Sequence, residues 1–335
     1  MTLKKPTRRT FLRTSTAAAG VAAVGAPLIA KGEAKHTLKI ASLAPDGSSW
    51  AKAFKMIARE VKARSDGAIK MQVYVGGVMG DEPAMIRKCR TGQLDGAAVT
   101  SVGLGEINKQ VLMMQFPMLF SNYKQVDRVR EKMKPSFEKL FADGGFHLSN
   151  WGDVGFLYPF SNTPVASPSD LKSTKFWVWD ADPVTKVTAE VAGVNGVELS
   201  VPDVLPSLQT GVIDACASSP YALISLQWYS KIKYVTNLRM AMGLGASVIS
   251  QKSFGKLSDD HKQLLMDVSN EYGAKLVKRI RKDNKKAVAT LTEKGVQVVE
   301  PTNMDEWKAI AKGVRKKLVG STFDADLVAE MDSYL

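Results

Sequence analysis

The chain has 335 residues, of which 45% are hydrophobic and 24% charged, and it contains two cysteines. This balance excludes a mostly disordered, collagen-like or disulfide-rich chain, and the length suffices for one large or two medium domains. The net charge of +13 includes five basic residues within 1–30, a segment without any acid. The remaining surplus is interleaved with acids, and its one concentration, at 275–286, is interpreted as the solvated face of a helix. No nucleic-acid partner is expected, because no recognisable binding module accompanies the charge.

The first 34 residues are predicted to be an export signal. The segment 7–13 (TRRTFLR) holds paired arginines, and a weakly hydrophobic Ala- and Gly-rich run follows at 14–30. That order is typical of a twin-arginine signal peptide, with cleavage after Ala30 or Ala34; an ordinary secretory signal or an uncleaved anchor is the alternative. The mature protein is therefore expected in the periplasm. Beyond this segment no apolar run is long enough to span a bilayer.

The two cysteines, Cys89 and Cys216, would then lie in an oxidising compartment. One disulfide is possible, but we expect the two residues in different lobes, where a bridge would hinder relative motion. The prediction is two buried thiols.

Strands and helices alternate in the first hundred residues of the body. A Gly-rich turn and a helix start with acids and proline follow the second strand, and such alternation favours an α/β lobe with a mostly parallel sheet. The predicted elements are a strand at 36–42, a helix at 49–65, a strand at 69–75, a helix from 81–83 to Gly92, and a strand at 94–100.

A weak internal echo suggests a second lobe of similar construction. The segments 91–97 (TGQLDGA) and 210–216 (TGVIDAC) share one plan, in which Gly92 or Gly211 ends a helix before a short strand. Chance recurrence of such corners is the alternative. Two facing α/β lobes form a cleft, and ligands of such sheets bind at the carboxyl ends of the strands. A long helix at 258–294 is expected to run along both lobes.

No enzyme motif is complete. Two Gly-x-Gly segments, at 103–105 and 243–245, begin like dinucleotide fingerprints, but Asn108 and Val248 replace the third glycine. No phosphate-binding loop is present, and the histidines stand alone without partners at metal-ligand spacing. The prediction is a protein that is not an enzyme and uses neither a cofactor nor a metal. The three histidines are His36, His147 and His261.

Several segments spread over the chain together resemble one family. They are 116–123 (FPMLFSNY), 164–172 (PVASPSDLK), 208–214 (LQTGVID), 233–236 (KYVT) and 295–298 (GVQV). From Ala41 to about Val299 the chain resembles the DctP-type solute receptors of TRAP transporters (tripartite ATP-independent periplasmic transporters).

This resemblance implies a two-lobed periplasmic-binding-protein-like α/β fold with hinge strands, a long helix across both lobes, and membrane subunits as partners. We expect lobe I to comprise 35–160 plus about 246–285, and lobe II to comprise 161–245 plus about 286–335.

One departure from the family pattern bears on the ligand. Where the family has Lys-Ile-Arg-Val, with an Arg that pairs with the ligand's carboxylate, this chain has 175–179 (KFWVW), so Trp177 stands in the place of that Arg. An indole has one N–H donor and no charge, and cannot replace a guanidinium. Together with 155–161 (GFLYPFS), the Trp-x-Trp resembles a divergent branch associated with a tetratricopeptide-repeat partner protein. The likeness suggests an apolar or amphipathic ligand.

On a strand, Trp177 and Trp179 point to one face and their neighbours to the other. We expect the two indoles to form an aromatic wall of the cleft; burial of both in the core is the alternative. Asp180 and Asp182 are expected to cap the turn before Pro183 rather than to bind ligand.

The remaining candidates for ligand binding are residues just past predicted strand ends, whereas the Met-rich run at 113–118 is predicted to be core. These candidates are Trp50, Met79, Ser101, Ser218, Ser219 and Tyr221. The expected function is capture of a small apolar or amphipathic ligand and its delivery to TRAP membrane subunits. A periplasmic lipid carrier, a receptor for organic acids and an exported enzyme are the alternatives.

Overall fold

The computed structural model describes residues 35–335. The predicted twin-arginine signal and its cleavage sites lie outside the described residues. Within 35–335, no helix is both long and apolar enough to cross a bilayer.

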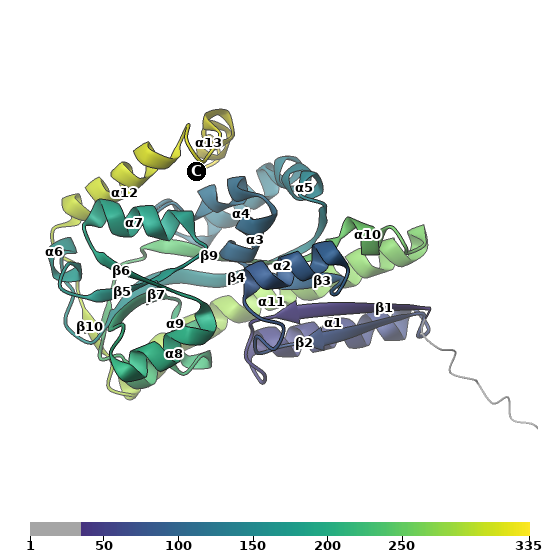
Figure 1. Cartoon of the computed structure of the whole chain (residues 1–335), viewed down its shortest axis with the longest axis horizontal. Helices are drawn as coiled ribbons and strands as arrows, with labels where there is room; N and C mark the ends of the chain where they lie inside the picture. The colour runs from purple at the N-terminus through teal and green to yellow at the C-terminus, as the bar shows by residue number, and fades with distance from the viewer. Residues whose placement is uncertain (1–34) are drawn as a thin grey trace, which may run out of the picture. The chain divides into compact units, whose positions relative to one another are not determined.

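A ten-stranded mixed sheet forms the centre of the described chain, with helices packed on it (Figure 1). Its main path is β2-β1-β3-β9-β4-β7-β5-β6, and β8 pairs with both β4 and β10. The strands are β1 His36–Ser42, β2 Ile69–Tyr74, β3 Gly96–Thr100, β4 Phe146–Ser161, β5 Lys175–Trp179, β6 Asn195–Leu199, β7 Ala215–Ser218, β8 Tyr234–Thr236, β9 Ala241–Ser250 and β10 Gln297–Val299.

The helices follow the strands in the alternating order expected of an α/β fold. They are α1 Ser49–Arg64, α2 Glu82–Thr91, α3 Ser101–Ile107, η1 Lys109–Gln115, α4 Tyr123–Lys132, α5 Lys134–Asp143, α6 Pro168–Leu171, α7 Pro183–Ala192, α8 Val201–Thr210, α9 Pro220–Ser225, η2 Trp228–Lys231, α10 Gln251–Phe254, α11 Asp259–Glu293, α12 Met304–Leu318 and α13 Ala325–Asp332.

The sheet has two parallel halves joined by two long antiparallel strands. Strands β1, β2 and β3 pair in parallel in lobe I, and β5, β6 and β7 do so in lobe II. Strands β4 and β9 pair antiparallel with each other, and β4 continues into lobe II to pair with β7 and β8. The two-lobed fold is confirmed, but the sheet is mixed rather than mostly parallel, because β4 and β9 run against their neighbours.

The internal echo corresponds to a repeated corner. Gly92 and Gly211 end α2 and α8 with φ of 81° and 74°, in the left-handed region that favours glycine, and each precedes a short strand. Both predicted helix ends are therefore confirmed.

Helix α11 is the predicted strut. Its 35 residues begin after the capping residue Ser258 and end before Gly295, and it spans about 52 Å at 1.5 Å per residue. It packs on α1 in lobe I, on β4, and on α9 in lobe II. One rigid element therefore contacts both lobes.

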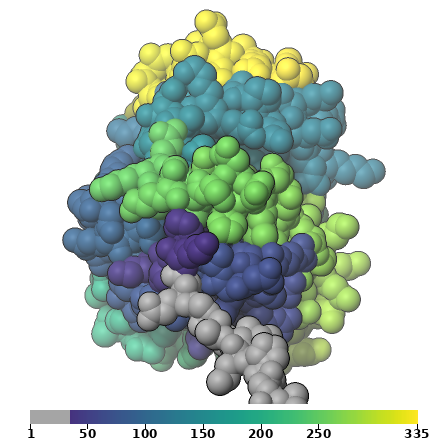
Figure 2. Space-filling view, turned by 90° about the vertical axis from the view of Figure 1, so that its right-hand side faces the viewer, coloured from purple at the N-terminus to yellow at the C-terminus, as the bar shows by residue number. Residues whose placement is uncertain are grey.

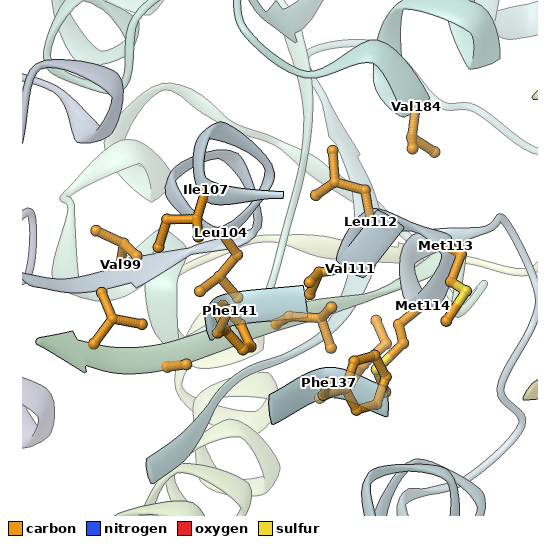
Figure 3. Close-up of a cluster of buried hydrophobic side chains, with 14 of the residues drawn as sticks. Val99, Leu104, Ile107, Val111, Leu112, Met113, Met114, Phe137, Phe141 and Val184 are labelled. Carbon is orange, nitrogen blue, oxygen red and sulfur yellow. The ribbon is translucent and has the colours of Figure 1, made fainter. Parts of the chain in front are cut away.

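The largest hydrophobic core lies in lobe I and includes the Met-rich run. Met113 and Met114 are fully buried beside Phe137 and Phe141 (Figure 3), which confirms the core prediction. The C-terminal helix α13 packs on the same core, and Figure 2 shows this C-terminal segment against the neighbouring lobe I surface. The exact lobe boundaries stay a prediction.

Cys89 and Cys216 are free, buried thiols in two different hydrophobic clusters, as predicted. Burial raises the pKa of each thiol to about 12, so neither is a reactive thiolate at neutral pH.

A buried carboxylate connects the inter-lobe strand to two helices. Asp153 of β4 is 1% exposed and accepts hydrogen bonds from Arg130 of α4 at 2.6 Å and from Arg281 of α11 at 2.7 Å. Arg281 also pairs with Asp127, which is half-exposed. The carboxylate thus pairs with two guanidinium groups at the place where β4, α4 and α11 meet.

We expect Asp153→Asn to lower the free energy of unfolding by about 3 kcal/mol, because it leaves two guanidinium groups without their shared buried counter-charge. Urea denaturation checks this value. Asp127→Asn is the control, with an expected loss below about 1 kcal/mol because the pair is solvated. Equal effects of the two variants would contradict the assignment.

Candidate ligand-binding site

The main cavity, of about 200 Å³, lies between the lobes at the carboxyl ends of four parallel strands. Ser42 ends β1, Thr100 ends β3, Trp179 ends β5 and Ser218 ends β7, and all four residues line it. This is where open α/β sheets bind ligands, since the turns after the strands diverge there. By the scale of a 150 Å³ cavity that holds benzene, the main cavity has room for about eight carbon atoms.

Indole rings form one wall of the main cavity. The Trp177 ring lies 5.9 Å from that of Trp179 and meets the ring of Trp228 edge-on at 5.2 Å. Trp177 Nε1 donates to the carbonyl oxygen of Leu199 at 3.0 Å. The indole N–H is therefore used by the protein, and the ring offers mainly apolar surface. Trp177 also packs on the lobe II core, so the aromatic wall is continuous with that core.

The sequence-predicted residues divide into two groups. Five line the main cavity, whereas three do not. Trp50, Ser101, Trp177, Trp179 and Ser218 line it; Met79, Ser219 and Tyr221 lie outside the lining.

The three residues outside the lining have structural partners. Ser219 is fully buried and caps α9 by accepting from Ala222 N. Met79 packs at the edge of the lobe I core, and its carbonyl oxygen accepts from Lys88. Tyr221 makes a hydrogen bond between the lobes. A position after a strand end brings a residue near the cleft, but local capping decides which way its side chain points.

Two polar contacts hold the lobes together beside the main cavity. The Tyr221 hydroxyl accepts from Ser49 N at 2.8 Å, and its ring centre lies 4.8 Å from that of Trp50, with the two ring planes tilted by 46°. Trp179 Nε1 donates to Asp81 Oδ2 at 3.0 Å, so β5 of lobe II is joined to the start of α2 in lobe I. Two of the predicted ligand-binding aromatics thus make inter-lobe hydrogen bonds.

Two buried carboxyl groups also line the main cavity. Glu82 is 0% exposed and accepts from Thr100 N at 2.7 Å and Gly103 N at 2.8 Å. Burial raises its pKa to about 7 despite these hydrogen bonds. Asp182 caps α7 by accepting from Val184 N, as predicted for the turn, and burial raises its pKa to about 6.

Basic side chains are absent from the lining. Within residues 35–335, no Lys, Arg or His lines the main cavity. Asp153 is a lining residue, and its carboxylate pairs with the guanidinium groups of Arg130 and Arg281, which are not in the lining. The described chain also contains no cluster of three His, Cys, Asp or Glu side chains suited to a metal ion.

Sequence reasoning missed several lining residues. Glu82 was interpreted only as a helix-start acid, Gln115 lay in a run assigned to the core, and Phe176 was placed on the face opposite the indoles. Trp228 lies in a short 3₁₀ helix without a periodic pattern, so no local signal marked it. An acid next to a proline at a helix start after a Gly-rich turn was the one usable signal, and it pointed to Glu82.

We expect the free energy of unfolding to fall as pH rises from about 4.5 to about 7. The folded state binds the Glu82 proton more tightly than the unfolded chain does, so its contribution is present below pH 4.5 and lost as pH passes 7. The loss from this group is about 3 kcal/mol. Asp182 adds a similar decrease between about 4 and 6.

The difference between wild type and Glu82→Gln in urea denaturation across pH 4.5–7 isolates the Glu82 contribution, because the amide does not titrate. Glu138→Gln, at an exposed position of α5, should keep the wild-type profile. A Glu82→Gln profile parallel to wild type would contradict the raised pKa.

The fold and the cleft define a class of protein: a two-lobed periplasmic-binding-protein-like receptor for a small solute. The comparisons with known proteins agree. Residues 40–321 match the family described as bacterial extracellular solute-binding protein, family 7 (DctP). The chain belongs to this family, which comprises the periplasmic solute receptors of TRAP transporters and is not enzymatic.

Two curated relatives carry named ligands. The chain is 24% identical over 273 residues to the sialic acid-binding periplasmic protein of Vibrio cholerae, which covers 80% of this chain and 84% of that protein. It is 25% identical over 254 residues to the 2,3-diketo-L-gulonate-binding periplasmic protein of Escherichia coli, covering 73% and 74%.

Solved structures share the fold. An extracytoplasmic solute receptor of Bordetella pertussis that binds pyroglutamic acid has a TM-score of 0.83 at 21% identity and covers 89% of this chain and 99% of its own. A TRAP periplasmic solute-binding protein of Citrobacter koseri with bound D-glucuronate has a TM-score of 0.82 at 23% identity, covering 88% and 98%.

Proposed function

We propose that this TRAP solute receptor captures a neutral, mainly apolar or amphipathic ligand in the main cavity and delivers it to the membrane subunits. The observation that carries the proposal is the lining: aromatic rings and buried carboxyl groups, with no Lys, Arg or His among the described residues. A ligand carboxylate in this cavity would lose its hydration without gaining a counter-charge, which is strongly unfavourable.

The carboxyl groups of the lining also favour a neutral ligand over an anion. Glu82 and Asp182 would repel an anion when ionised, and each already accepts backbone hydrogen bonds. A neutral ligand group that donates a hydrogen bond suits them better than a carboxylate. Apolar contact with the wall of Trp177, Trp179 and Trp228 contributes roughly 25 cal/mol per Å² of buried surface.

A receptor for an acidic sugar or another organic acid is the second candidate. It is favoured by the relatives, whose names and bound ligands are sialic acid, 2,3-diketo-L-gulonate, pyroglutamic acid and D-glucuronate. Such a ligand would require a cation at the cleft. Arg130, whose Nε has no hydrogen-bond partner within the described residues, is one source, but its Nη1 donates to Asp153 and its Nη2 to the carbonyl oxygen of Gly152. The proposed twin-arginine export and the tetratricopeptide-repeat partner are predictions from the sequence that accompany either candidate.

Isothermal titration at pH 7 separates the two candidates. We expect saturable binding of N-methyloctanamide, a neutral amphipathic probe whose octanoyl chain matches the room in the main cavity, and no saturable heat with D-glucuronate or pyroglutamate. Saturable binding of either acid, with none of the amide, would overturn the proposal in favour of the organic-acid receptor.

The indole wall is tested by a matched pair of variants. Trp177→Phe removes about 40 Å² of ligand contact and should weaken amide binding about fivefold. Trp307→Phe is the control: this buried indole also donates to a carbonyl, that of Thr302 at 3.1 Å, but lies outside the cavity lining. It should lower stability without changing affinity. Equal affinities of Trp177→Phe and wild type would place the indole outside the ligand contact.

A further inference from the structure

A second cavity of about 70 Å³ lies behind the wall of the main cavity. Helix α7 provides one side of it through small residues, among them Thr188, Ala189 and Ala192. Leu171 and Met240 contribute further apolar surface. On the scale used above, this cavity has room for about three carbon atoms.

The two cavities share part of their lining, so only a single layer of side chains separates them. The side chains that border both are Gln115, Leu157, Phe176, Thr185 and Ala217. The side chains of Leu157 and Phe176, which border both cavities, carry rotatable χ1 and χ2 bonds. The partition is therefore narrow and made partly of adjustable groups.

A polar group stands at this partition without a hydrogen-bond partner. Gln115 is 6% exposed, and its Nε2 makes no hydrogen bond to any residue in 35–335. Burial raises the pKa of Asp182, and the nearby Gln115 side chain partly offsets that rise, but its Nε2 falls short of hydrogen-bond geometry with the carboxyl group. An unpaired buried amide is unfavourable, so a group that accepts from Gln115 and donates toward Asp182 would relieve it.

We propose that the ligand is elongated and has two apolar arms joined by a neutral group with both a donor and an acceptor, such as a secondary amide or a hydroxyl. The longer arm lies in the main cavity against the indoles. The joining group meets Gln115 at the partition, and the shorter arm of about three carbon atoms occupies the second cavity. This inference rests on the proposed function, because it specifies the class of neutral ligand which that function requires.

A series of N-alkyl octanamides tests the second cavity. Affinity should rise about fourfold per methylene from N-methyl to N-propyl, and N-hexyl should bring no further gain because the cavity is filled. Ala189→Leu fills the second cavity and should abolish the gain from N-methyl to N-propyl while leaving N-methyl affinity unchanged. Ala192→Leu serves as a second filling variant if the first does not fold.

Ala63→Leu, on the exposed face of α1, is the matched control and should keep the wild-type chain-length profile. A gain that survives both filling variants, or a wild-type profile that is flat from N-methyl onward, would overturn the second cavity as a binding site while leaving the proposed function standing. Absence of binding by every amide, together with saturable binding of D-glucuronate, would instead overturn the proposed function and this inference with it.

A separate affinity measurement tests the role of Gln115. Gln115→Leu should weaken N-propyloctanamide and propyl octanoate, an ester of the same length, by a similar factor, because both present a carbonyl oxygen to Gln115 Nε2. Unchanged affinity for both ligands would contradict the placement of the joining group at Gln115.

Discussion

The candidate site depends on one interaction, the pairing of the buried Asp153 carboxylate with two arginines. Asp153 lies in β4, the strand that continues from lobe I to lobe II, and it binds Arg130 and Arg281 from two helices packed beside that strand. Its backbone carbonyl also accepts from Trp50 Nε1 at 3.0 Å. Asp153 therefore links the inter-lobe strand β4 to two helices. It also positions the Trp50 ring in the cavity lining and pairs with two guanidinium groups.

This arrangement explains the electrostatic character of the main cavity. The chain is rich in Lys and Arg, yet the cavity lining within the described residues has acids and no bases, and the arginines beside the lining residue Asp153 are paired with its carboxylate. The acids that remain are desolvated, which raises the pKa of Glu82 to about 7 and of Asp182 to about 6. The cavity thus combines an apolar wall with two carboxyl groups whose pKa values are raised by burial.

Some aromatic residues at the cleft form the wall of the main cavity, and others make hydrogen bonds between the lobes. Trp177 and Trp228 form the wall, whereas Trp179 and Tyr221 also hydrogen-bond across to Asp81 and Ser49. These two hydrogen bonds join the lobes beside the main cavity, so the same aromatic residues contribute to the lining or its edge and to the contact between the lobes.

Much of the architecture could be predicted from local patterns. The corners at Gly92 and Gly211, the strut helix after Ser258 and the buried thiols all follow from chain-local rules: glycine in a left-handed helix end, a capping serine and apolar periodicity. The indoles at 177 and 179 could be placed on one strand face for the same reason, since side chains alternate along a strand.

Tertiary structure alone decided which residues meet. Glu82, Gln115 and Trp228 are far apart in the chain and carry no shared motif, and they line one cavity because four strand ends converge there. Met79 and Ser219 follow strand ends too, but core packing and helix capping turn them away. The amino-acid sequence by itself determined the elements, their ends and the family resemblance, because these depend on neighbours along the chain. The composition of the cavity and the second cavity behind it depend on the packing of distant segments, which no local pattern encodes.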